Sequence, residues 1–380
     1  MNKVIIAAAG SGKTTHIVNE AIRNNNQRIL ITTYTDANTT EIKSRFYTEF
    51  GAIPKNITVL PWYTFLLKHG VRPFQGIIYK KRIPNIHLIS GISAKGISKD
   101  DVAKYYFDPK GLIYSDKISA FAYACNEKYN GAVISRISQI FDAIYIDELQ
   151  DLAGWDLEFL ELLMQSNITL LLVGDPRQAT LATNHSNKNR NKSQTNLLHY
   201  LKSIKDKYSI DIDETSLDTN HRCHKDICSF SNELYRPEEF PPAKSDFDTG
   251  TEKHVGVFLV REEDVDSYMV EYTPIQLRYS VKTEIRESYK YQNFRKSKGL
   301  TYNRTLIYPT SPILDWIFSK KELAPISKCG FYVALTRARY SVGIIVSPKY
   351  YNKKCNLVFW RKAPQNEFTI LPNRDLLTLE

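Results

Sequence analysis

A chain of 380 residues is long enough for two ordinary domains, each with its own hydrophobic core. Its 42% hydrophobic and 24% charged residues are typical of a soluble globular protein, and its apolar stretches, such as Ile168–Val173, have the length of a strand. This excludes a membrane-spanning protein, because a span needs about 20 apolar residues. Lys and Arg outnumber Asp and Glu by 51 to 41, and the net charge of +10 favours a polyanionic partner without requiring one.

The cysteines and the first residues of the chain predict a cytoplasmic protein. Five cysteines are scattered along the sequence, and no second cluster completes the zinc site that Cys223, His224 and Cys228 would begin. Reduced thiols of this kind fit the cytoplasm. The apolar start at residues 4–9 is too short for a signal peptide and leads directly into a glycine-containing loop.

The first predicted element is a buried strand, Val4–Ala8, followed by that loop and then by a helix-like stretch from Thr15 to Arg23. Small residues let backbone N–H groups close around a phosphate, and the helix N-terminus adds the positive end of its dipole. In such a loop the lysine reaches the β- and γ-phosphates, and the next hydroxyl binds Mg²⁺. We therefore predict ATP and Mg²⁺ as cofactors, with Thr14 on the metal. The residues expected to hold the nucleotide are Ala9, Gly10, Ser11, Gly12, Lys13, Thr14 and Thr15.

Along the rest of the chain, short apolar runs alternate with amphipathic stretches, which predicts an α/β fold built on parallel sheets. In the first half, further strands are expected at Arg28–Thr33, Thr58–Leu60, Ala143–Asp147 and Leu170–Gly174, with helices at Asp36–Phe50 and Trp155–Gln165. In the second half, strands are expected at Val255–Val260, Thr305–Tyr308 and Val342–Val346, with helices around Lys225–Tyr235 and Gly330–Ala338. The first set of elements ends at Leu217–Arg222, where we expect a hinge.

Two carboxylates, Asp147 and Glu148, stand at the end of the apolar strand Ala143–Asp147. Parallel sheets build their sites at the carboxyl ends of their strands. We predict that Asp147 holds the Mg²⁺ shell and that Glu148 orients and deprotonates the attacking water. An acidic surface turn is the ordinary alternative for such a pair, and the phosphate loop earlier in the chain favours the catalytic interpretation.

Three further residues are predicted to act on the γ-phosphate. Gln178 follows the strand Leu170–Gly174 and is a candidate sensor of that phosphate, although a proline-containing turn explains the segment equally well. Phosphoryl transfer also needs cations outside the γ-phosphate, and Arg222 and Arg337 have suitable surroundings in the second half of the chain. ATP would then lie between two domains, and its hydrolysis would open and close a cleft.

Seven segments, in order along the chain, resemble the UvrD/Rep-like branch of superfamily 1 helicases. They are residues 7–15, 33–37, 147–151, 173–178, 220–222, 297–300 and 332–339. The first reads Ala-Ala-Ala-Gly-Ser-Gly-Lys-Thr-Thr, the third Asp-Glu-Leu-Gln-Asp, and the last Tyr-Val-Ala-Leu-Thr-Arg-Ala-Arg. The resemblance implies two RecA-like P-loop NTPase domains, ATP-driven movement along single-stranded DNA and, usually, 3′-to-5′ unwinding. It also implies γ-phosphate contacts for Arg222 and Arg337, and a coupling role for Gln178.

The resemblance extends to nucleic acid, because its second segment implies that Tyr34 and Thr35 contact single-stranded DNA. The aromatic stretch that follows the Gln178 segment in that family is missing here, and a basic loop at Asn184–Gln194 comes instead. We predict that other aromatic and basic side chains replace it, by stacking on bases or by contacting phosphates. The candidates are Trp62, Tyr63, Lys188, Arg190, Arg295 and Lys298. Core packing for the two aromatics, and plain solubility for the loop, are equal alternatives.

Three departures from the family pattern concern the nucleotide base. No glutamine-containing segment precedes the phosphate loop, and His221 stands where an aromatic residue usually stacks on adenine. Thr301 replaces an acidic residue that lies near the ribose in that family. We therefore expect the base to be recognised loosely.

The predicted organisation is a first RecA-like domain at residues 1–216, with a small helical insertion at about 66–142, and a second at residues 217–380. The predicted function is an ATP-dependent translocase or helicase of the UvrD/Rep type, acting on single-stranded DNA and on partial duplexes. The alternative is a nucleotide- and DNA-sensing ATPase subunit of a larger assembly, for example a phage-defence complex with a nuclease. Intact hydrolytic residues favour the first function, whereas missing stacking residues and the lack of a large accessory domain favour the second.

Overall fold

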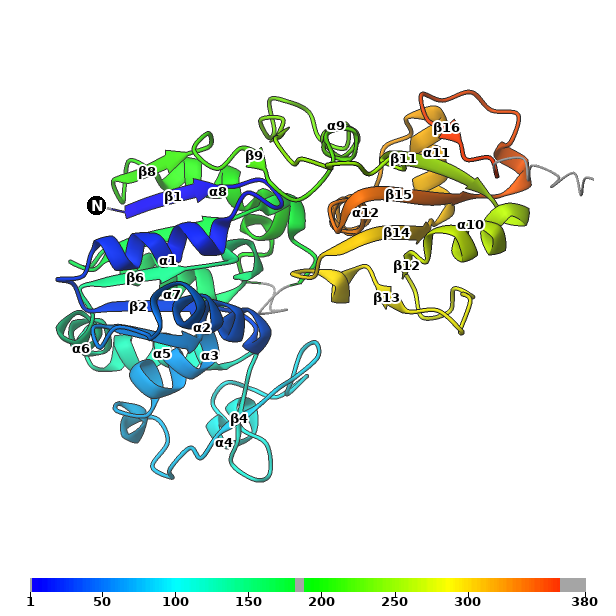
Figure 1. Ribbon diagram of the computed structural model, residues 1–380. Coiled ribbons are helices and arrows are strands. Elements are labelled where there is room, and N and C mark those ends of the chain that lie inside the picture. Colours follow the sequence, from blue (N-terminus) through cyan, green and yellow to red (C-terminus); the bar gives the residue numbers. More distant parts are fainter. Residues whose placement is uncertain (1, 182–187, 363–380) are drawn as a thin grey trace, which may run out of the picture.

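The structure, a computed structural model, describes residues 2–181 and 188–362 and contains two separate six-stranded sheets (Figure 1). Every strand pair within these two sheets is parallel. Parallel pairing needs long crossover connections, and most of those between these strands contain a helix. The fold therefore belongs to the α/β class with two RecA-like domains, which confirms the prediction.

The first sheet has the strand order β3-β2-β6-β7-β1-β8. Its strands are β1 (Asn2–Ile6), β2 (Ile29–Thr33), β3 (Ile57–Pro61), β6 (Ala143–Ile146), β7 (Thr169–Gly174) and β8 (Ile210–Asp213). β6 is buried along its whole length, which is why its sequence is an unbroken apolar run rather than an alternating one. β1 lies between β7 and β8, so the loop after β1 leaves the sheet beside the end of β7.

The helices of this domain come from the segments between its strands. They are α1 (Lys13–Arg23), α2 (Asp36–Phe50), α3 (Trp62–Phe65), α7 (Trp155–Met164) and α8 (Leu197–Ile204). α1 begins directly after Gly12, and α2 begins where the hydroxyl of Thr35 accepts a hydrogen bond from the Asn38 N–H. Both helices therefore start at the carboxyl end of the sheet, where α/β folds bind their ligands.

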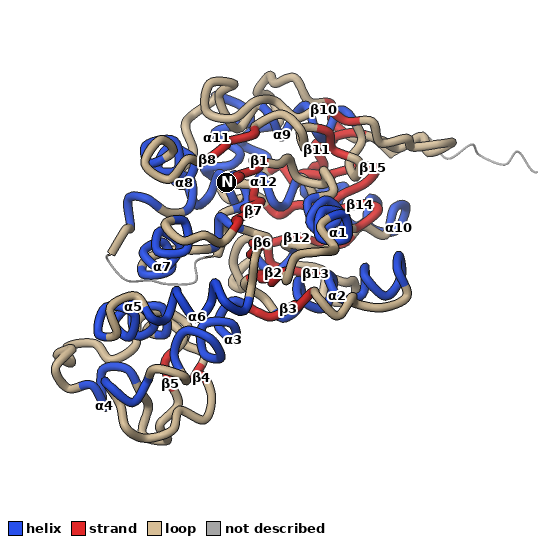
Figure 2. The backbone as a smooth tube through the Cα atoms, turned by 90° about the vertical axis from the view of Figure 1, so that its left-hand side faces the viewer, coloured by secondary structure: helices blue, strands red, loops and turns tan. Residues whose placement is uncertain are grey.

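Residues 66–142 form an insertion below the first sheet in Figure 1, and Figure 2 shows it projecting to one side of the molecule. It contains α4 (Val102–Tyr106), α5 (Ile118–Lys128), α6 (Ala132–Ile140) and a short parallel pair, β4 (Ile86–His87) with β5 (Ile113–Tyr114). A π-helical turn at Leu66–Val71 joins it to α3. The insertion is small and helical, as predicted, apart from the β4–β5 pair.

The second sheet has the order β13-β12-β14-β15-β11-β16. Its strands are β11 (Gly256–Arg261), β12 (Ile275–Arg278), β13 (Tyr291–Asn293), β14 (Tyr302–Tyr308), β15 (Ala338–Val346) and β16 (Val358–Phe359). Its helices are α9 (Lys225–Asn232), α10 (Val265–Tyr272), α11 (Ser311–Ser319) and α12 (Pro325–Leu335). A separate pair, β9 (Thr219–Asn220) with β10 (Lys244–Ser245), lies in the segment between the two sheets.

Two details of the second domain differ from the expected elements. The helix expected at Gly330–Ala338 starts at Pro325 and stops at Leu335, because proline suits the first turn of a helix and β15 begins at Ala338. Arg337 therefore lies in the tight turn between α12 and β15.

No helix within the described ranges is long and apolar enough to cross a bilayer.

Candidate nucleotide site and nucleic-acid interface

Two glycines in left-handed conformations, Gly10 (φ 73°) and Gly12 (φ 77°), shape the phosphate loop at the end of β1. A Cβ on Gly10 would stand 2.6 Å from Oδ1 of Asn220 and 2.8 Å from Cβ of Arg222. The backbone N–H of His221 donates to the Gly10 carbonyl at 3.0 Å. The loop is thus packed against the segment that leads from the first sheet to the second, and position 10 has no room for a side chain.

The loop offers polar groups that suit a phosphate chain and its Mg²⁺. Ser11 Oγ is buried, and no described residue hydrogen-bonds to it. Lys13 Nζ donates back to the carbonyl of Ala8, at 3.4 Å. Thr14 Oγ1 donates to Asp147 Oδ2 at 3.0 Å, which puts a hydroxyl and a carboxylate side by side, as a Mg²⁺ shell requires. The donors present therefore fit the cofactors that the sequence predicts.

Glu148 follows β6 with a left-handed φ of 56°, an uncommon value for a residue with a side chain. Its N–H donates to Asp147 Oδ1 at 2.9 Å. Burial, and then the Glu148 charge, raise the pKa of Asp147. Burial also acts to raise the pKa of Glu148, but the ammonium groups of Lys298 and Lys13 outweigh it and lower that pKa. Glu148 is therefore the carboxylate that stays ionised, as an acceptor of protons must.

Lys298 lies in the interior, with its side chain 7% exposed, between carboxylates of the first domain. Its Nζ is 2.7 Å from Asp151 Oδ1 and 3.1 Å from Glu148 Oε2. Buried carboxylates at the end of β6 need a counter-charge, and this lysine supplies one. The predicted contact of Lys298 with nucleic acid is therefore not available in this arrangement, because the ammonium group is already enclosed by acids.

Gln178 links a carboxylate of the first domain to a guanidinium of the second. Its Nε2 donates to Asp175 Oδ2 at 2.9 Å, and its Oε1 accepts from Arg337 Nη2 at 3.2 Å. The other N–H groups of Arg337 donate to the carbonyls of Val333 at 3.0 Å and Leu300 at 3.3 Å. The amide of Gln178 thus spans the two sides of the cleft.

Arg222 and Arg337 form no ion pair with any residue in the described ranges, although both line the cleft. Arg222 Nη1 donates to the Thr336 carbonyl at 3.3 Å. Burial, and then the neighbouring Arg222, lower the pKa of Arg337. A buried guanidinium and a partly buried one, neither paired with a carboxylate of the described residues, favour the arrival of an anion such as a phosphate.

One cavity gathers nine of the residues predicted to bind or hydrolyse ATP. They are Gly10, Gly12, Lys13, Thr14, Asp147, Glu148, Gln178, Arg222 and Arg337. Residues from both domains line this cavity, so the structure places the predicted nucleotide site in the cleft between them.

Sequence reasoning missed one face of α2 that also lines this cavity, formed by Asn38, Glu41 and Arg45. Arg45 Nη1 donates to Thr15 Oγ1 at 2.7 Å, and Arg45 Nη2 forms an ion pair with Glu41 at 2.9 Å. The spacing of three and four residues is that of one helix face, and this signal was available in the sequence. The face ties the end of the phosphate loop to α2.

Arg177 is a second residue to which no role was assigned from its sequence motif. It is buried, and its Nε forms an ion pair with Asp175 Oδ1 at 2.7 Å. Its guanidinium lies over the ring of Tyr332, 5.3 Å from the centroid. Arg177 therefore holds Asp175, and with it Gln178, against the second domain.

The aromatic candidates for nucleic-acid binding differ in exposure. Trp62 is fully buried and its indole N–H donates to Asp156 Oδ1 at 2.6 Å, while Tyr63 is 7% exposed. Both lie in the core of the first domain, which was the alternative interpretation. Tyr34 and Thr35 are only partly buried, and the rings of Tyr34 and Tyr63 meet edge to face at 5.5 Å. Of these four, Tyr34 and Thr35 are the ones a strand can reach.

The basic candidates outside the cleft are exposed. Lys188 Nζ lies 3.3 Å from Glu158 Oε1 and 5.2 Å from the ring centre of Trp155. Arg190 and Arg295 are exposed and form no ion pair with another described residue. Residues 184–187 of the predicted basic loop lie outside the described residues.

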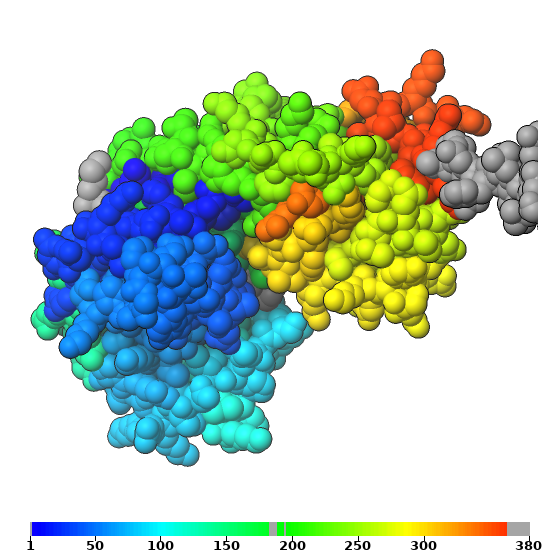
Figure 3. Space-filling view, in the orientation of Figure 1, coloured from blue at the N-terminus to red at the C-terminus, as the bar shows by residue number. Residues whose placement is uncertain are grey.

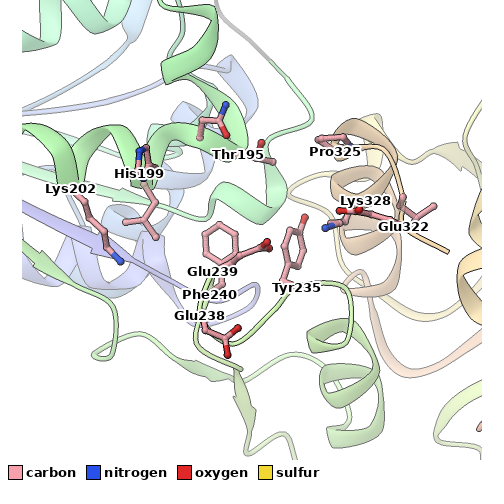
Figure 4. Close-up of a pocket in the computed structure, with 13 residues that line it drawn as sticks. Thr195, His199, Lys202, Tyr235, Glu238, Glu239, Phe240, Glu322, Pro325 and Lys328 are labelled. Atoms are coloured by element: carbon pink, nitrogen blue, oxygen red, sulfur yellow. The ribbon is translucent and has the colours of Figure 1, made fainter. Parts of the chain in front are cut away.

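A second, larger cavity of about 480 Å³ lies between α8, the segment 235–240 and the start of α12 (Figure 4). Its lining is mixed in charge, with Glu238, Glu239 and Glu322 facing Lys202 and Lys328. Lys328 Nζ lies over the Tyr235 ring at 5.2 Å. None of the residues predicted to bind ATP or nucleic acid lines it.

Family models match the chain on both sides of the cleft. A model of the AAA domain matches residues 1–184, and a model of the viral superfamily 1 RNA helicase core domain matches residues 128–346, more than half of the chain. No curated protein matches the sequence. The helicase model confirms that the chain contains a superfamily 1 helicase core domain.

Two solved structures of Arterivirus nonstructural protein 10 (helicase) align with the chain, the second of them a complex with DNA. The first is 14% identical, with a TM-score of 0.47, and the match covers 91% of this chain and 59% of that one. The second is 15% identical, with a TM-score of 0.47 and coverages of 91% and 61%. The chain thus spans about three fifths of the length of these structures. By the match over residues 128–346, the chain belongs to the family of the viral superfamily 1 RNA helicase core domain.

Proposed function

We propose that the chain hydrolyses ATP between its two domains and uses this hydrolysis to move 3′ to 5′ along single-stranded DNA, in the manner of UvrD/Rep-like helicases. One observation carries the proposal: Arg222 and Arg337 from the second domain line the same cavity as Lys13 and Thr14 from the first. A site that is complete only when two domains meet converts hydrolysis into relative movement. We place the boundary between the domains at residues 216 and 217, just before β9.

The contacts of the first domain support a task for each predicted residue. MgATP, when bound, supplies the reacting γ-phosphorus. Thr14 and Asp147 would hold its Mg²⁺, and Lys13 would neutralise the β- and γ-phosphates. Glu148 Oε2 is held by Lys298 and by Gln150 Nε2, and its Oε1 has no partner among the described residues. That free oxygen would orient the attacking water and accept its proton.

The second domain would complete the site. Arg222 and Arg337, which form no ion pair with a described residue, would neutralise the charge that spreads over the γ-phosphate oxygens. Loss of that phosphate would leave the two cations facing each other and favour opening of the cleft. Gln178, hydrogen-bonded to Asp175 and to Arg337, would pass this change between the domains.

The strand is proposed to cross the face where the first sheet ends and the second domain begins. Tyr34 and Thr35 follow β2 at the carboxyl end of the first sheet, and Arg295 is exposed on the second domain. Figure 3 shows a notch between the insertion and the second domain on one face of the molecule. Lys188 and Arg190 would add phosphate contacts, whose strength depends on salt.

ATP hydrolysis measured without polynucleotide, and with single-stranded DNA, duplex DNA and RNA, tests the proposal. We expect single-stranded DNA to raise the turnover number several-fold, and a duplex with a 3′ tail to be unwound in preference to one with a 5′ tail. Greater stimulation by RNA would support ATP-driven movement along a strand but would show that the strand is RNA rather than DNA. Turnover that none of the polymers changes would overturn the proposal.

A second function is favoured by the burial of Trp62 and Tyr63, which removes two predicted stacking surfaces from the strand. The chain would then be a nucleotide- and DNA-sensing ATPase subunit of a larger assembly, for example one with a nuclease in phage defence. In that case ATP should change the affinity for single-stranded DNA while DNA leaves turnover of the isolated chain unchanged. Addition of the partner protein, rather than of a strand, should then raise turnover.

A further inference from the structure

Three carboxylates, Asp147, Glu148 and Asp151, come together at the end of β6, where Asp147 and Asp151 are buried. Lys298 reaches them from the segment between β13 and β14. Its Nζ lies 2.7 and 2.8 Å from the two oxygens of Asp151 and 3.1 Å from Glu148 Oε2. The side chains of Lys298 and Asp151 are 7% and 1% exposed. This is a built, enclosed cluster rather than a surface ion pair.

The cluster is also the electrostatic link between the two halves of the molecule. Among the ion pairs within 4.0 Å that the described residues form, only those of Lys298 join residues 2–216 to residues 217–362. Opening of the cleft would separate Lys298 from Glu148 and Asp151. Two carboxylates would then face each other without their shared counter-charge, which is unfavourable in a protein interior.

Lys298 also fixes the orientation of the Glu148 carboxylate. Lys298 and Gln150 Nε2 both donate to the same oxygen, Oε2, while Oε1 has no partner among the described residues. Gln150 is held in turn, because its Oε1 accepts from the Asp175 N–H at 2.9 Å. A carboxylate held through one oxygen keeps the other at a fixed position, where it can meet a water molecule.

The turn that carries Lys298 faces solvent on one side. Arg295 and Lys296 are exposed there, and neither forms an ion pair with a described residue. Between them and Lys298, Ser297 is fully buried and its hydroxyl donates to the Phe294 carbonyl at 2.7 Å. The exposed cations and the buried ammonium therefore belong to one short, braced turn.

The same segment also reaches the second arginine of the cleft. Two residues after Lys298, the carbonyl of Leu300 accepts from Arg337 Nη1 at 3.3 Å. Movement of this turn would therefore reach Glu148 and Arg337 together.

We propose that Lys298 is a positioning residue that latches the cleft shut and fixes Glu148 for catalysis. Strand phosphates held by Arg295 and Lys296 would stabilise the turn in this latched position. The inference rests on the proposed function and explains how a strand would stimulate hydrolysis. Strand binding would stabilise the turn that carries Lys298. Lys298 in turn keeps the cleft closed and keeps Glu148 in position.

The variant Lys298→Met, which keeps the length of the side chain and removes its charge, tests this. Lys320→Met is the matched control, because Lys320 forms an exposed ion pair with Glu233 inside the second domain. We expect Lys298→Met to lower strand-free kcat about 10- to 100-fold with KM for ATP nearly unchanged, since a misplaced catalytic group costs about that much. Lys298→Arg should restore part of the rate, because it keeps the charge.

Energy transfer between dyes reports the latch without any turnover. The dyes are placed at Tyr47→Cys in α2 and Lys321→Cys in the second domain, both exposed positions, with Cys355→Ser removing the partly exposed native thiol. In Lys298→Met we expect lower transfer, from a more open cleft, and no recovery on addition of single-stranded DNA. Lys320→Met should match the parent protein in transfer and in kcat.

Each result decides the inference separately from the proposed function. Unchanged kcat and unchanged transfer in Lys298→Met would overturn the latch, as would equal losses in Lys320→Met. If the parent protein hydrolyses ATP at a rate indifferent to strands, the proposed function fails, while the strand-free comparison of the variants still decides the latch. If the parent protein has no turnover, the energy-transfer comparison decides it alone.

Discussion

The nucleotide cavity and the expected nucleic-acid surface differ in how well motifs in the sequence locate them. Nine predicted residues from distant parts of the chain line one cavity. In contrast, Trp62, Tyr63 and Lys298, all expected to touch nucleic acid, lie in the interior. A phosphate chain with Mg²⁺ needs hydrogen-bond donors and ligands at fixed spacing, so the residues that bind it form recognisable sequence motifs. A nucleic-acid strand can be bound by any suitably placed aromatic ring or cation, so its binding surface is defined by the folded shape rather than by a sequence motif.

The sharpest test of the nucleotide side is Glu148→Gln. The amide keeps the size of the side chain but cannot accept the proton of the attacking water, so we expect kcat to fall about 10³- to 10⁴-fold. ATP affinity should stay, because Lys13 and Thr14 are untouched. Single-turnover hydrolysis measures the rate of the chemical step, and equilibrium ATP binding measures the affinity. The exposed Glu239→Gln is the control, and a rate within tenfold of the parent protein would remove Glu148 from this role.

Arg337→Ala tests whether the second domain takes part in the chemistry. Removing one buried cation from the cleft should lower kcat about 10²- to 10³-fold with little change in ATP affinity. Arg339→Ala, an exposed arginine two residues further on, is the matched control. If both variants hydrolyse ATP at the parent rate, the cavity is a binding site of the first domain alone.

Trp62→Ala sharpens the other side of the comparison. Because the indole is fully buried and hydrogen-bonded to Asp156, its loss should lower the free energy of unfolding by about 3–5 kcal/mol. The folded fraction should still bind single-stranded DNA with unchanged affinity. Tyr34→Ala should do the opposite, with a small loss of stability and weaker binding. Denaturant unfolding and fluorescence anisotropy measure the two quantities, and weaker binding by folded Trp62→Ala would return that ring to the strand.

The smallest expected effect is that of the double variant Lys188→Ala, Arg190→Ala. If both side chains contact phosphates, the slope of log affinity against log salt should fall by about 1.4, at about 0.7 for each contact on a single strand. Affinity itself should drop several-fold. Lys353→Ala, Lys354→Ala removes the same charge from another exposed site and should leave the slope alone. An unchanged slope in the first variant would return the loop to a solubility role.

Much of the fold was predictable because its central strands are buried on both faces. β6 and β7 are continuous apolar runs, so pattern alone located them. β12 and β13 are short, and Tyr291–Asn293 at the sheet edge carries polar residues, so no run of apolar residues marked them. The end of α12 was placed three residues late, since the sequence alone does not show that β15 begins at Ala338.

For the site too, what could be predicted depended on whether a residue's role follows from its local sequence or from contacts with distant parts of the chain. Residues whose task needs a local motif, such as Lys13 or Glu148, were predictable one by one. The partner of Lys298 was not, because Glu148 and Lys298 are brought together only by the packing of two domains. Arg45 lay between these cases: its helix face was visible in the sequence, and its contact with Thr15 was not.

The most direct test of the whole account is kcat for ATP in the wild-type protein, measured at saturating ATP with and without saturating single-stranded DNA. The account predicts an increase of several-fold, because a strand held across both domains should favour the closed cleft in which Arg222 and Arg337 meet the phosphates. Equal rates with and without the strand would contradict it.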